Sequence, residues 1–330
     1  MIDVGKKWKI YKEQLSKINM DGTGAAMKKV QSVQIATFMR ATKERNRLEL
    51  ERTARKLKEL LKNENLSETA ITITGSDGRL EKGFFSESEI VIFARNELDP
   101  AIAGKIKSHG LDVEIKRIEL DILSFYEGNR NTVFPQRVYD SVVVLGDNQI
   151  FLEAKRVLVA EWKTVRGVKE EIKRKKAEYK GTIRGEQNWK GRKIKNFDLD
   201  AGEAHYHTDE LGAKIRSFKN GPLRWVQFVI ANSLISTVKA RTLDEGIEIL
   251  QNIPTPTDEK IEFLRAARVL DLEAGEAKEL AEIYDYFLCL YHKSEAEAKK
   301  GNSMTKFEPK EVKERITDLE KIIEGMGVIQ

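Results

Sequence analysis

The segment from Thr74 to Glu89 contains residue types and spacings that could perform chemistry. It begins with a small-residue turn, Gly75-Ser76, whose backbone N–H groups are free to face an anion. It ends with two carboxylates, Glu87 and Glu89, at the start of an apolar run. Side chains two positions apart on a strand point to the same side, so we expect these carboxylates to converge on one cation. A phosphate cradle facing a paired-carboxylate metal site is what nucleotidyl transfer from a nucleoside triphosphate requires.

The elements around this segment predict a mixed sheet. Ala70 to Thr74 alternates and predicts a strand, and the apolar run Ile90 to Ala94 predicts a second strand. The next predicted elements are a short helix over 101–108, an extended stretch over 112–125 and a strand over 138–145. This order predicts an α/β (α+β) fold, with a mixed sheet and flanking helices over residues 66–150.

The rest of the chain is predicted to be mainly helical. Residues 30–62 hold no Pro or Gly and predict a long helix with room for one break. Residues 150–180 are predicted to be largely helical, and the Gly-rich residues 181–222 to form loops and short elements. The later helices are predicted over 223–251, 257–271, 276–299 and 309–326. We expect Thr257 and Asp258 to cap the second of these later helices.

Four domains or segments follow from this order. They are an N-terminal helical segment over 1–65, the α/β domain over 66–150, a charged helix and Gly-rich connection over 151–222, and a C-terminal helical domain over 223–330.

The Thr74 to Glu89 segment resembles the nucleotidyltransferase motif of the bacterial glutamine synthetase adenylyltransferases, the nitrogen-regulatory uridylyltransferases and their relatives. The family pattern is Gly-Ser/Gly-x-Gly-Arg-x-Glu, four residues, then Ser-Asp-x-Asp. The residues in register with it are Gly75, Ser76, Gly78, Arg79, Glu81 and Ser86. Both aspartates of the pattern are replaced here, by Glu87 and Glu89. Residues 134–155 are similar to a further stretch of the relatives.

A second segment, Lys219 to Phe228, is similar to the family's Lys-x-Gly-x-Gly-Leu/Ile-Arg-Asp-Ile-Gln/Glu-Phe, which opens a helix after the catalytic module. The resemblance implies that this helix start closes one side of the nucleotide pocket. It also implies that Lys219 and Arg224 neutralise triphosphate charge. Trp225 stands where the family has an acidic residue, and a plain helix start would account for Pro222.

A third carboxylate is expected on a neighbouring strand, where it would help to bind a second metal ion and orient the attacking hydroxyl. Glu114 is our candidate, because the stretch around it is similar to the family's Val-Asp-x-Arg strand. Asp112 lies on the same strand face and is the reserve candidate, and Glu119 and Asp121 are further reserves. Strand alternation does not choose among them.

The resemblance implies transfer of a nucleoside monophosphate, AMP from ATP, to an acceptor hydroxyl on a protein, with Mg²⁺ or Mn²⁺ as cofactor. The implied catalytic and metal-binding residues are Glu87, Glu89 and Glu114, and the implied nucleotide-binding residues are Gly75, Ser76, Arg79, Lys219 and Arg224. Within this set, Arg79 is expected to brace the turn together with Glu81 rather than to touch the substrate.

Two other functions stay open. Replacing every metal aspartate by glutamate keeps the charge but lengthens each ligand, and Mg²⁺ demands near-ideal geometry. The protein could therefore be a nucleotide-sensing or protein-binding pseudoenzyme on the same fold. Residues 163–195 hold 13 Lys and Arg against four Glu, which suits an RNA-associated protein. A solvated helix with a basic loop would account for that composition equally well.

Length and composition set broad limits. The 330 residues are 40% hydrophobic and 34% charged, with a net charge of +5, which predicts a substantial core under a solvated surface. No apolar run reaches the length of a membrane span, so no membrane association is expected. The single cysteine, Cys289, lies in an apolar context and rules out an internal disulfide, which favours a cytoplasmic setting.

Overall fold

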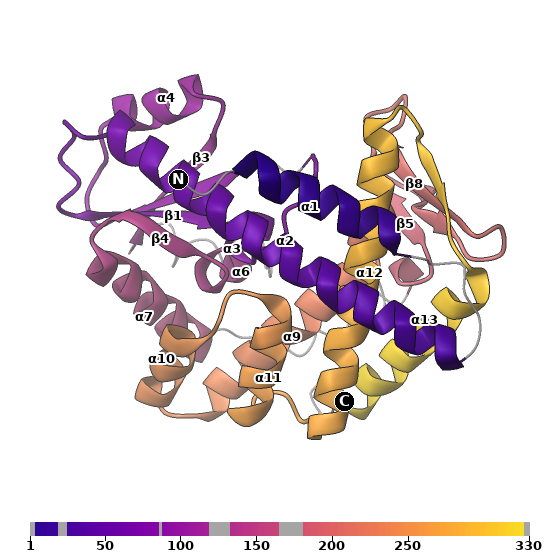
Figure 1. Cartoon of the computed structure of the whole chain (residues 1–330). Helices are drawn as coiled ribbons and strands as arrows, with labels where there is room; N and C mark the ends of the chain where they lie inside the picture. Colours follow the sequence, from indigo (N-terminus) through magenta and orange to yellow (C-terminus); the bar gives the residue numbers. More distant parts are fainter. Residues whose placement is uncertain (1–3, 19–24, 86–87, 119–132, 165–180, 327–330) are drawn as a thin grey trace.

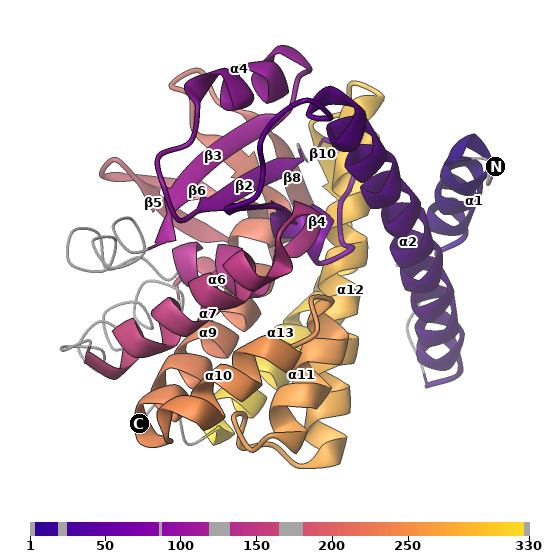
Figure 2. The ribbon, with the colours of Figure 1, turned by 90° about the vertical axis from the view of Figure 1, so that its left-hand side faces the viewer.

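The computed structural model describes residues 4–18, 25–85, 88–118, 133–164 and 181–326. Within these ranges the chain folds as an α+β protein, which confirms the predicted class (Figure 1). Figure 2 shows α1 (Val4–Lys17) and α2 (Ala25–Leu60) side by side along one flank of the molecule. The predicted long helix is α2, and it runs without a break.

The central sheet has the order β3-β2-β1-β4. Its strands are β1 (Thr69–Thr74), β2 (Glu89–Ala94), β3 (Asp112–Arg117) and β4 (Val142–Gly146). β2 and β3 are parallel and the other pairs are antiparallel, so the predicted mixed sheet is confirmed.

The strand predicted over 138–145 begins later than expected. Val138 and Tyr139 end helix α6 (Val133–Tyr139), and both side chains are fully buried. These apolar residues predicted a strand, but they are apolar because they pack a helix against the core. Of the extended stretch predicted over 112–125, residues 112–117 form β3, and residues 119–132 lie outside the described ranges.

The register of the sheet places the predicted carboxylates on one face. Thr74 pairs with Glu89, Glu89 pairs with Asp112, and Val91 pairs with Glu114. Paired neighbours share a face, so Glu89, Asp112 and Glu114 lie on the side that contains Val91. Val91 belongs to the large core, formed with the helices beyond the sheet.

The opposite face of the sheet is closed by helices and carries no site residue. Ile71, Ile90 and Ile92 pack there against the end of α2 and against helix α4 (Pro100–Ser108). Asp99 caps α4 by accepting the N–H of Ala101 at 2.8 Å. Helix α7 (Asn148–Thr164) covers the first face, where Phe151 packs on Phe93.

The C-terminal half is a helical module. Its helices are α9 (Pro222–Ala240), α10 (Leu243–Asn252), α11 (Thr257–Ala266), α12 (Ala274–Lys299) and α13 (Pro309–Gly325). The helix predicted over 223–251 is two helices, because Thr242 caps α10 in a capping box with Glu245. The predicted cap at Thr257 is wrong: Pro256 precedes α11, and the Thr257 hydroxyl is used elsewhere.

Residues 181–222 contain more strand than predicted. The strands are β5 (Glu186–Trp189), β6 (Arg192–Lys195), β7 (Phe197–Asp198), β8 (Glu203–Thr208) and β9 (Lys214–Arg216). β10 (Met304–Lys306) joins β8 from the far end of the chain. These strands are short and charged, and most of them pair with the next strand along the chain, while β8 also pairs with the distant β10.

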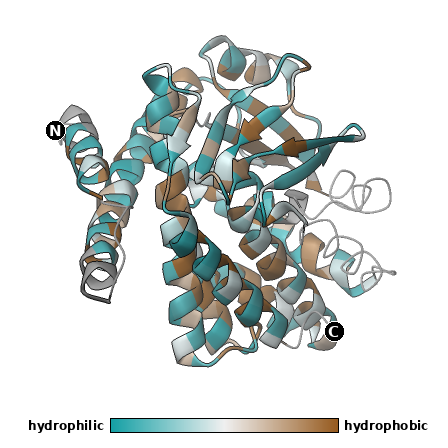
Figure 3. Cartoon of the chain, turned by 90° about the vertical axis from the view of Figure 1, so that its right-hand side faces the viewer, coloured by the Kyte–Doolittle hydropathy of each residue, from teal (hydrophilic) through white to brown (hydrophobic). Residues whose placement is uncertain are grey.

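One large hydrophobic core joins segments from across the chain. It includes Phe38 of α2, Phe93 of β2, Leu158 of α7 and Phe287 of α12. Figure 3 shows hydrophobic residues gathered where helices and strands face each other. The buried thiol of Cys289 lies in this core, as predicted. No helix in the described ranges is long and apolar enough to span a bilayer.

Candidate functional site

A pocket of about 360 Å³ lies between the sheet and the helical module. Its sheet-side wall is the turn after β1, with Gly75, Ser76 and Glu89. Its other wall comes from the start of α9, with Lys219 and Arg224, and from α12. The chain therefore brings together residues that lie about 130 positions or more apart in the sequence, including both segments that carry the family resemblance.

The Gly75 turn holds the pocket open on the sheet side. Gly75 has a φ of +68°, a conformation that side chains disfavour, and begins the short helix α3 (Gly75–Gly78). A Cβ built on Gly75 would lie 3.1 Å from Oε2 of Glu89, so the carboxylate rests directly on the turn. A Cβ on Gly78 would lie 2.1 Å from the backbone oxygen of Asp140. Both glycines of the motif are thus required by close approach.

The Glu89 carboxylate faces the pocket at the start of β2. It has no hydrogen bond or ion pair with any residue in the described ranges. Lys82 braces the loop that leads to it, donating to Asp77 at 2.9 Å and to Ser88 at 2.7 Å. Glu87, the partner predicted for Glu89, lies outside the described residues together with Ser86.

Glu114 is near this site but outside the pocket lining. Its carboxylate accepts hydrogen bonds from Arg137 and forms an ion pair with Lys116 at 2.8 Å. Arg137, on α6, lines the pocket and pairs with the carboxylate that was predicted to be the third metal ligand. Asp112, the reserve candidate, is exposed, and Glu119 and Asp121 lie outside the described residues.

Lys219 and Arg224 supply positive charge on the opposite wall. Lys219 lies in the 3₁₀ turn η1 (Ser217–Asn220), and its ammonium lies 5.5 Å from the centre of the Tyr291 ring. Burial lowers the pKa of Lys219. Neither cation has a hydrogen bond or ion pair to a carboxylate in the described part of the chain. Lys219 and Arg224 thus face the Glu89 carboxylate across the pocket, and the charges of Glu295 and Glu89 partly offset the lowering of the Lys219 pKa by burial.

Arg79 has both of its carboxylate partners within the protein. Its guanidinium donates to Glu81 at 2.8 Å and to Asp140 at 2.8 Å. Burial alone would lower the pKa of Arg79, but Glu81 and Asp140 raise it well above its usual value. Asp140 also accepts from Lys260 of α11, which is fully buried. Arg79 lines the pocket, yet this pairing gives it the bracing position expected together with Glu81.

Glu81 links the motif to the helical module. Its carboxylate accepts from the hydroxyl of Tyr284 at 2.8 Å and from that of Thr257. Gln227 of α9 donates to both hydroxyls, at 3.0 Å and 2.8 Å. The ring of His292 contacts the Glu81 backbone oxygen at 3.1 Å, and burial lowers the pKa of His292 to about 3. The turn and the helical wall are therefore held by one buried network.

A second pocket of about 600 Å³ adjoins the first and shares Ser76, Glu89, Lys219, Arg224 and Tyr291 with it. The strands between residues 186 and 216 form its far side, where Lys214 and Arg216 add positive charge. Arg216 lies over the Tyr206 ring at 4.5 Å. The two pockets are therefore neighbours that share the Glu89 carboxylate.

The described residues supply only part of a metal site. They contain no group of three His, Cys, Asp or Glu side chains placed to hold an ion. Glu89 is the unpaired carboxylate in the pocket, and Glu87 is not described. Mg²⁺ is commonly held by one or two carboxylates together with substrate phosphates and water. Glu89 fits that role for an ion that arrives with a triphosphate.

No protein-family model matches this chain, and no curated protein matches it.

Several pocket residues were not predicted from the sequence. Gln227 falls inside the second resembling segment and Arg137 inside residues 134–155, so both could have been found there. Asp140 also falls inside residues 134–155, but its pairing with Lys260 spans 120 positions of sequence and leaves no local signal. Tyr284 and Tyr291 lie in an apolar helical pattern that predicts core packing alone.

Proposed function

We propose that this protein transfers a nucleoside monophosphate, AMP from ATP, to an acceptor hydroxyl in a reaction that depends on Mg²⁺ or Mn²⁺. The observation that supports this most is the meeting of the Gly75-Ser76 turn, the unpaired Glu89 carboxylate and two unpaired cations in one pocket. A triphosphate with its divalent ion supplies the charges that this set lacks.

Each residue has a distinct part in the proposed reaction. The backbone of the Gly75-Ser76 turn receives the β- and γ-phosphates, and Lys219 and Arg224 neutralise their charge. Glu89, together with Glu87, holds the divalent ion, which stabilises charge on the phosphoryl oxygens. The acceptor oxygen bonds to the α-phosphorus, the bond from that phosphorus to the β-phosphate oxygen breaks, and pyrophosphate leaves. The hydroxyl proton passes to solvent.

The adjoining pocket offers the acceptor a route to the α-phosphate, since both pockets share Ser76 and Glu89. The family resemblance implies a protein side chain as acceptor.

The second candidate function is a nucleotide-sensing or protein-binding pseudoenzyme. The pairing of Glu114 with Arg137 and Lys116 favours it, because a carboxylate neutralised by two cations is a poor metal ligand. The third alternative, RNA association through residues 163–195, stays a prediction, since residues 165–180 lie outside the described ranges.

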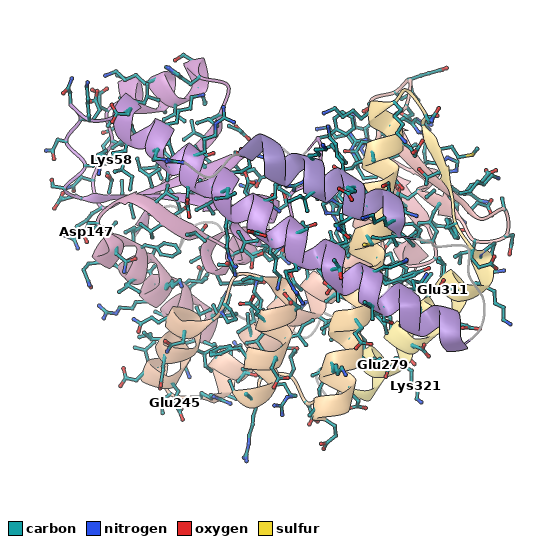
Figure 4. The ribbon with its side chains drawn as sticks, viewed as in Figure 1. Lys58, Asp147, Glu245, Glu279, Glu311 and Lys321 are labelled. Atoms are coloured by element: carbon teal, nitrogen blue, oxygen red, sulfur yellow. The ribbon has the colours of Figure 1, made fainter. Side chains whose placement is uncertain are left out.

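Incubation with α-labelled ATP, Mg²⁺ or Mn²⁺ and a cell lysate tests the proposal. We expect a labelled band that Glu89→Gln reduces by about a hundredfold or more, since small misplacements of reacting groups already cost that much. Glu279→Gln, on the exposed surface of α12, is the matched control and should label normally (Figure 4).

The outcome also separates the two leading candidates. If ATP raises the melting temperature but no band is labelled with either metal, the protein is the nucleotide-sensing pseudoenzyme. A protein that ATP neither stabilises nor labels is neither of them.

A further inference from the structure

Gln227 occupies an unusual position in the pocket. It lies near the start of α9, where its side chain is only 6% exposed, and it lines the pocket. Its amide nitrogen, Nε2, donates to Thr257 Oγ1 at 2.8 Å and to Tyr284 Oη at 3.0 Å. Its amide oxygen, Oε1, is buried and has no hydrogen-bond partner among the described residues.

Proton counting fixes this orientation of the amide. Both hydroxyls, of Thr257 and Tyr284, donate to the Glu81 carboxylate. The Glu81 carboxylate also accepts from the guanidinium of Arg79 at 2.8 Å, so it is the acceptor for all three of these donors. Each hydroxyl has one proton, already given to Glu81, so each can only accept from Gln227. The amide must therefore turn its NH₂ group toward the hydroxyls and its oxygen away from them.

We propose that the amide oxygen of Gln227 accepts a hydrogen bond from the exocyclic amino group of the nucleotide base. This inference rests on the proposed function and adds a specificity determinant to it. The site then selects a nucleoside triphosphate whose base carries an amino group, as adenine does, over one with an oxo group in the same place. If the base carried an oxo group there, its oxygen would face Oε1 of Gln227. Both atoms are hydrogen-bond acceptors, so both would be buried without a donor, which is unfavourable.

The surroundings of Gln227 suit a base. Leu223 and Leu288 line the same pocket and offer apolar surface to a flat ring. Among the charged residues that line the pocket, Arg79 is already paired with Glu81 and Asp140. Glu89 comes from the turn side, and Lys219 from the entry to α9. A nucleotide can therefore place its phosphates at the charged side and its base beside Gln227.

Binding of non-hydrolysable ATP and ITP analogues with Mg²⁺, measured by calorimetry on the full chain, tests this directly. The two bases differ in that inosine has a 6-oxo group where adenosine has a 6-amino group. We expect the ATP analogue to bind about 5- to 150-fold more tightly, the range that a buried unsatisfied acceptor gives. In Gln227→Met the two analogues should bind with similar affinity, because the acceptor that distinguishes their bases is gone and the ATP analogue loses its hydrogen bond.

Gln251→Met, on α10 and outside both pockets, is the control and should keep the ATP preference. Equal affinity of the wild type for both analogues overturns the inference while leaving nucleotide binding intact. A loss of affinity in Gln227→Met that is equal for both analogues also overturns it, because it reveals a purely structural role. Failure of the folded wild type to bind either analogue contradicts the proposed function itself.

Discussion

At the scale of single residues, Gly75 couples the shape of the turn to the position of the carboxylate. Its φ of +68° strains any side chain, and a Cβ there would lie 3.1 Å from Oε2 of Glu89, so that the carboxylate would have to shift. In Gly75→Ala we expect a loss of about 1–2 kcal/mol in the free energy of unfolding from the backbone alone. We also expect the methyl group to displace the Glu89 carboxylate and weaken nucleotide binding.

Urea unfolding and calorimetry on Gly75→Ala measure the two effects. Gly104→Ala is the matched control: a Cβ there meets nothing within 4 Å, and the position is inside α4. It should stabilise the protein slightly, because alanine favours helix. Wild-type stability in Gly75→Ala would contradict the positive φ at this position, and unchanged nucleotide binding would contradict the effect of the close approach to Glu89.

Residue types and spacing predicted much of the pocket. Gly75, Ser76 and Glu89 came from the motif, and Lys219 and Arg224 from the second segment. The structure places all five on one pocket, although their binding of a nucleotide stays a prediction. Glu114 could not be judged from its strand, because the cation that neutralises it, Arg137, arrives from a helix 23 positions away.

At the scale of elements, the pair Asp140 and Lys260 ties the end of α6 to α11. Both side chains are almost fully buried, at 1% and 0% exposure. Burial lowers the pKa of Lys260, while Asp140 favours its charged form. In Asp140→Asn, Lys260 loses its only carboxylate partner among the described residues and Arg79 loses one of two. We expect a loss of about 3–5 kcal/mol in the free energy of unfolding.

Adding Lys260→Met to Asp140→Asn should restore a large part of that stability, because it removes the stranded charge. Chemical denaturation of the two single variants and the double variant measures the interaction free energy between Asp140 and Lys260. Additive losses in the double variant would show that the two residues do not interact.

Elements differed in how well the sequence predicted them. β1, β2 and α4 follow from local alternation and from Pro100 at a helix start. The predicted start of β4 was too early. Val138 and Tyr139 are apolar because they pack helix α6 against the core, and not because they belong to the strand. The short strands between residues 186 and 216 are mostly paired locally, but β8 also pairs with β10, which is about 100 positions away.

At the scale of the whole molecule, the core contains a buried cation with no carboxylate partner among the described residues. Burial first, and Lys260 second, lower the pKa of Lys155 to about 8. An unfolded lysine titrates near pH 10.4. Between about pH 8 and pH 10 the unfolded chain holds a proton that the folded chain has released, so the free energy of unfolding rises with pH there.

Lys155→Met removes the pH-dependent contribution of this lysine to the free energy of unfolding. At pH 7 we expect the variant to be more stable than the wild type by on the order of 1 kcal/mol. That advantage should shrink as the pH approaches 10. Guanidinium unfolding at pH 7 and pH 10 measures it, and an advantage that does not change with pH would contradict a depressed pKa.

The pocket itself is a property of the whole molecule, since the sheet and the helical module each supply one wall. Titration of the full chain with a non-hydrolysable ATP analogue and Mg²⁺, followed by calorimetry, therefore tests its role most directly. We predict saturable binding at one site, weakened about tenfold or more in Arg224→Ala, where a charge-assisted contact is lost. Lys321→Ala, on α13, should bind as the wild type does (Figure 4). An absence of saturable binding, or equal binding by both variants, would contradict a nucleotide site at this pocket.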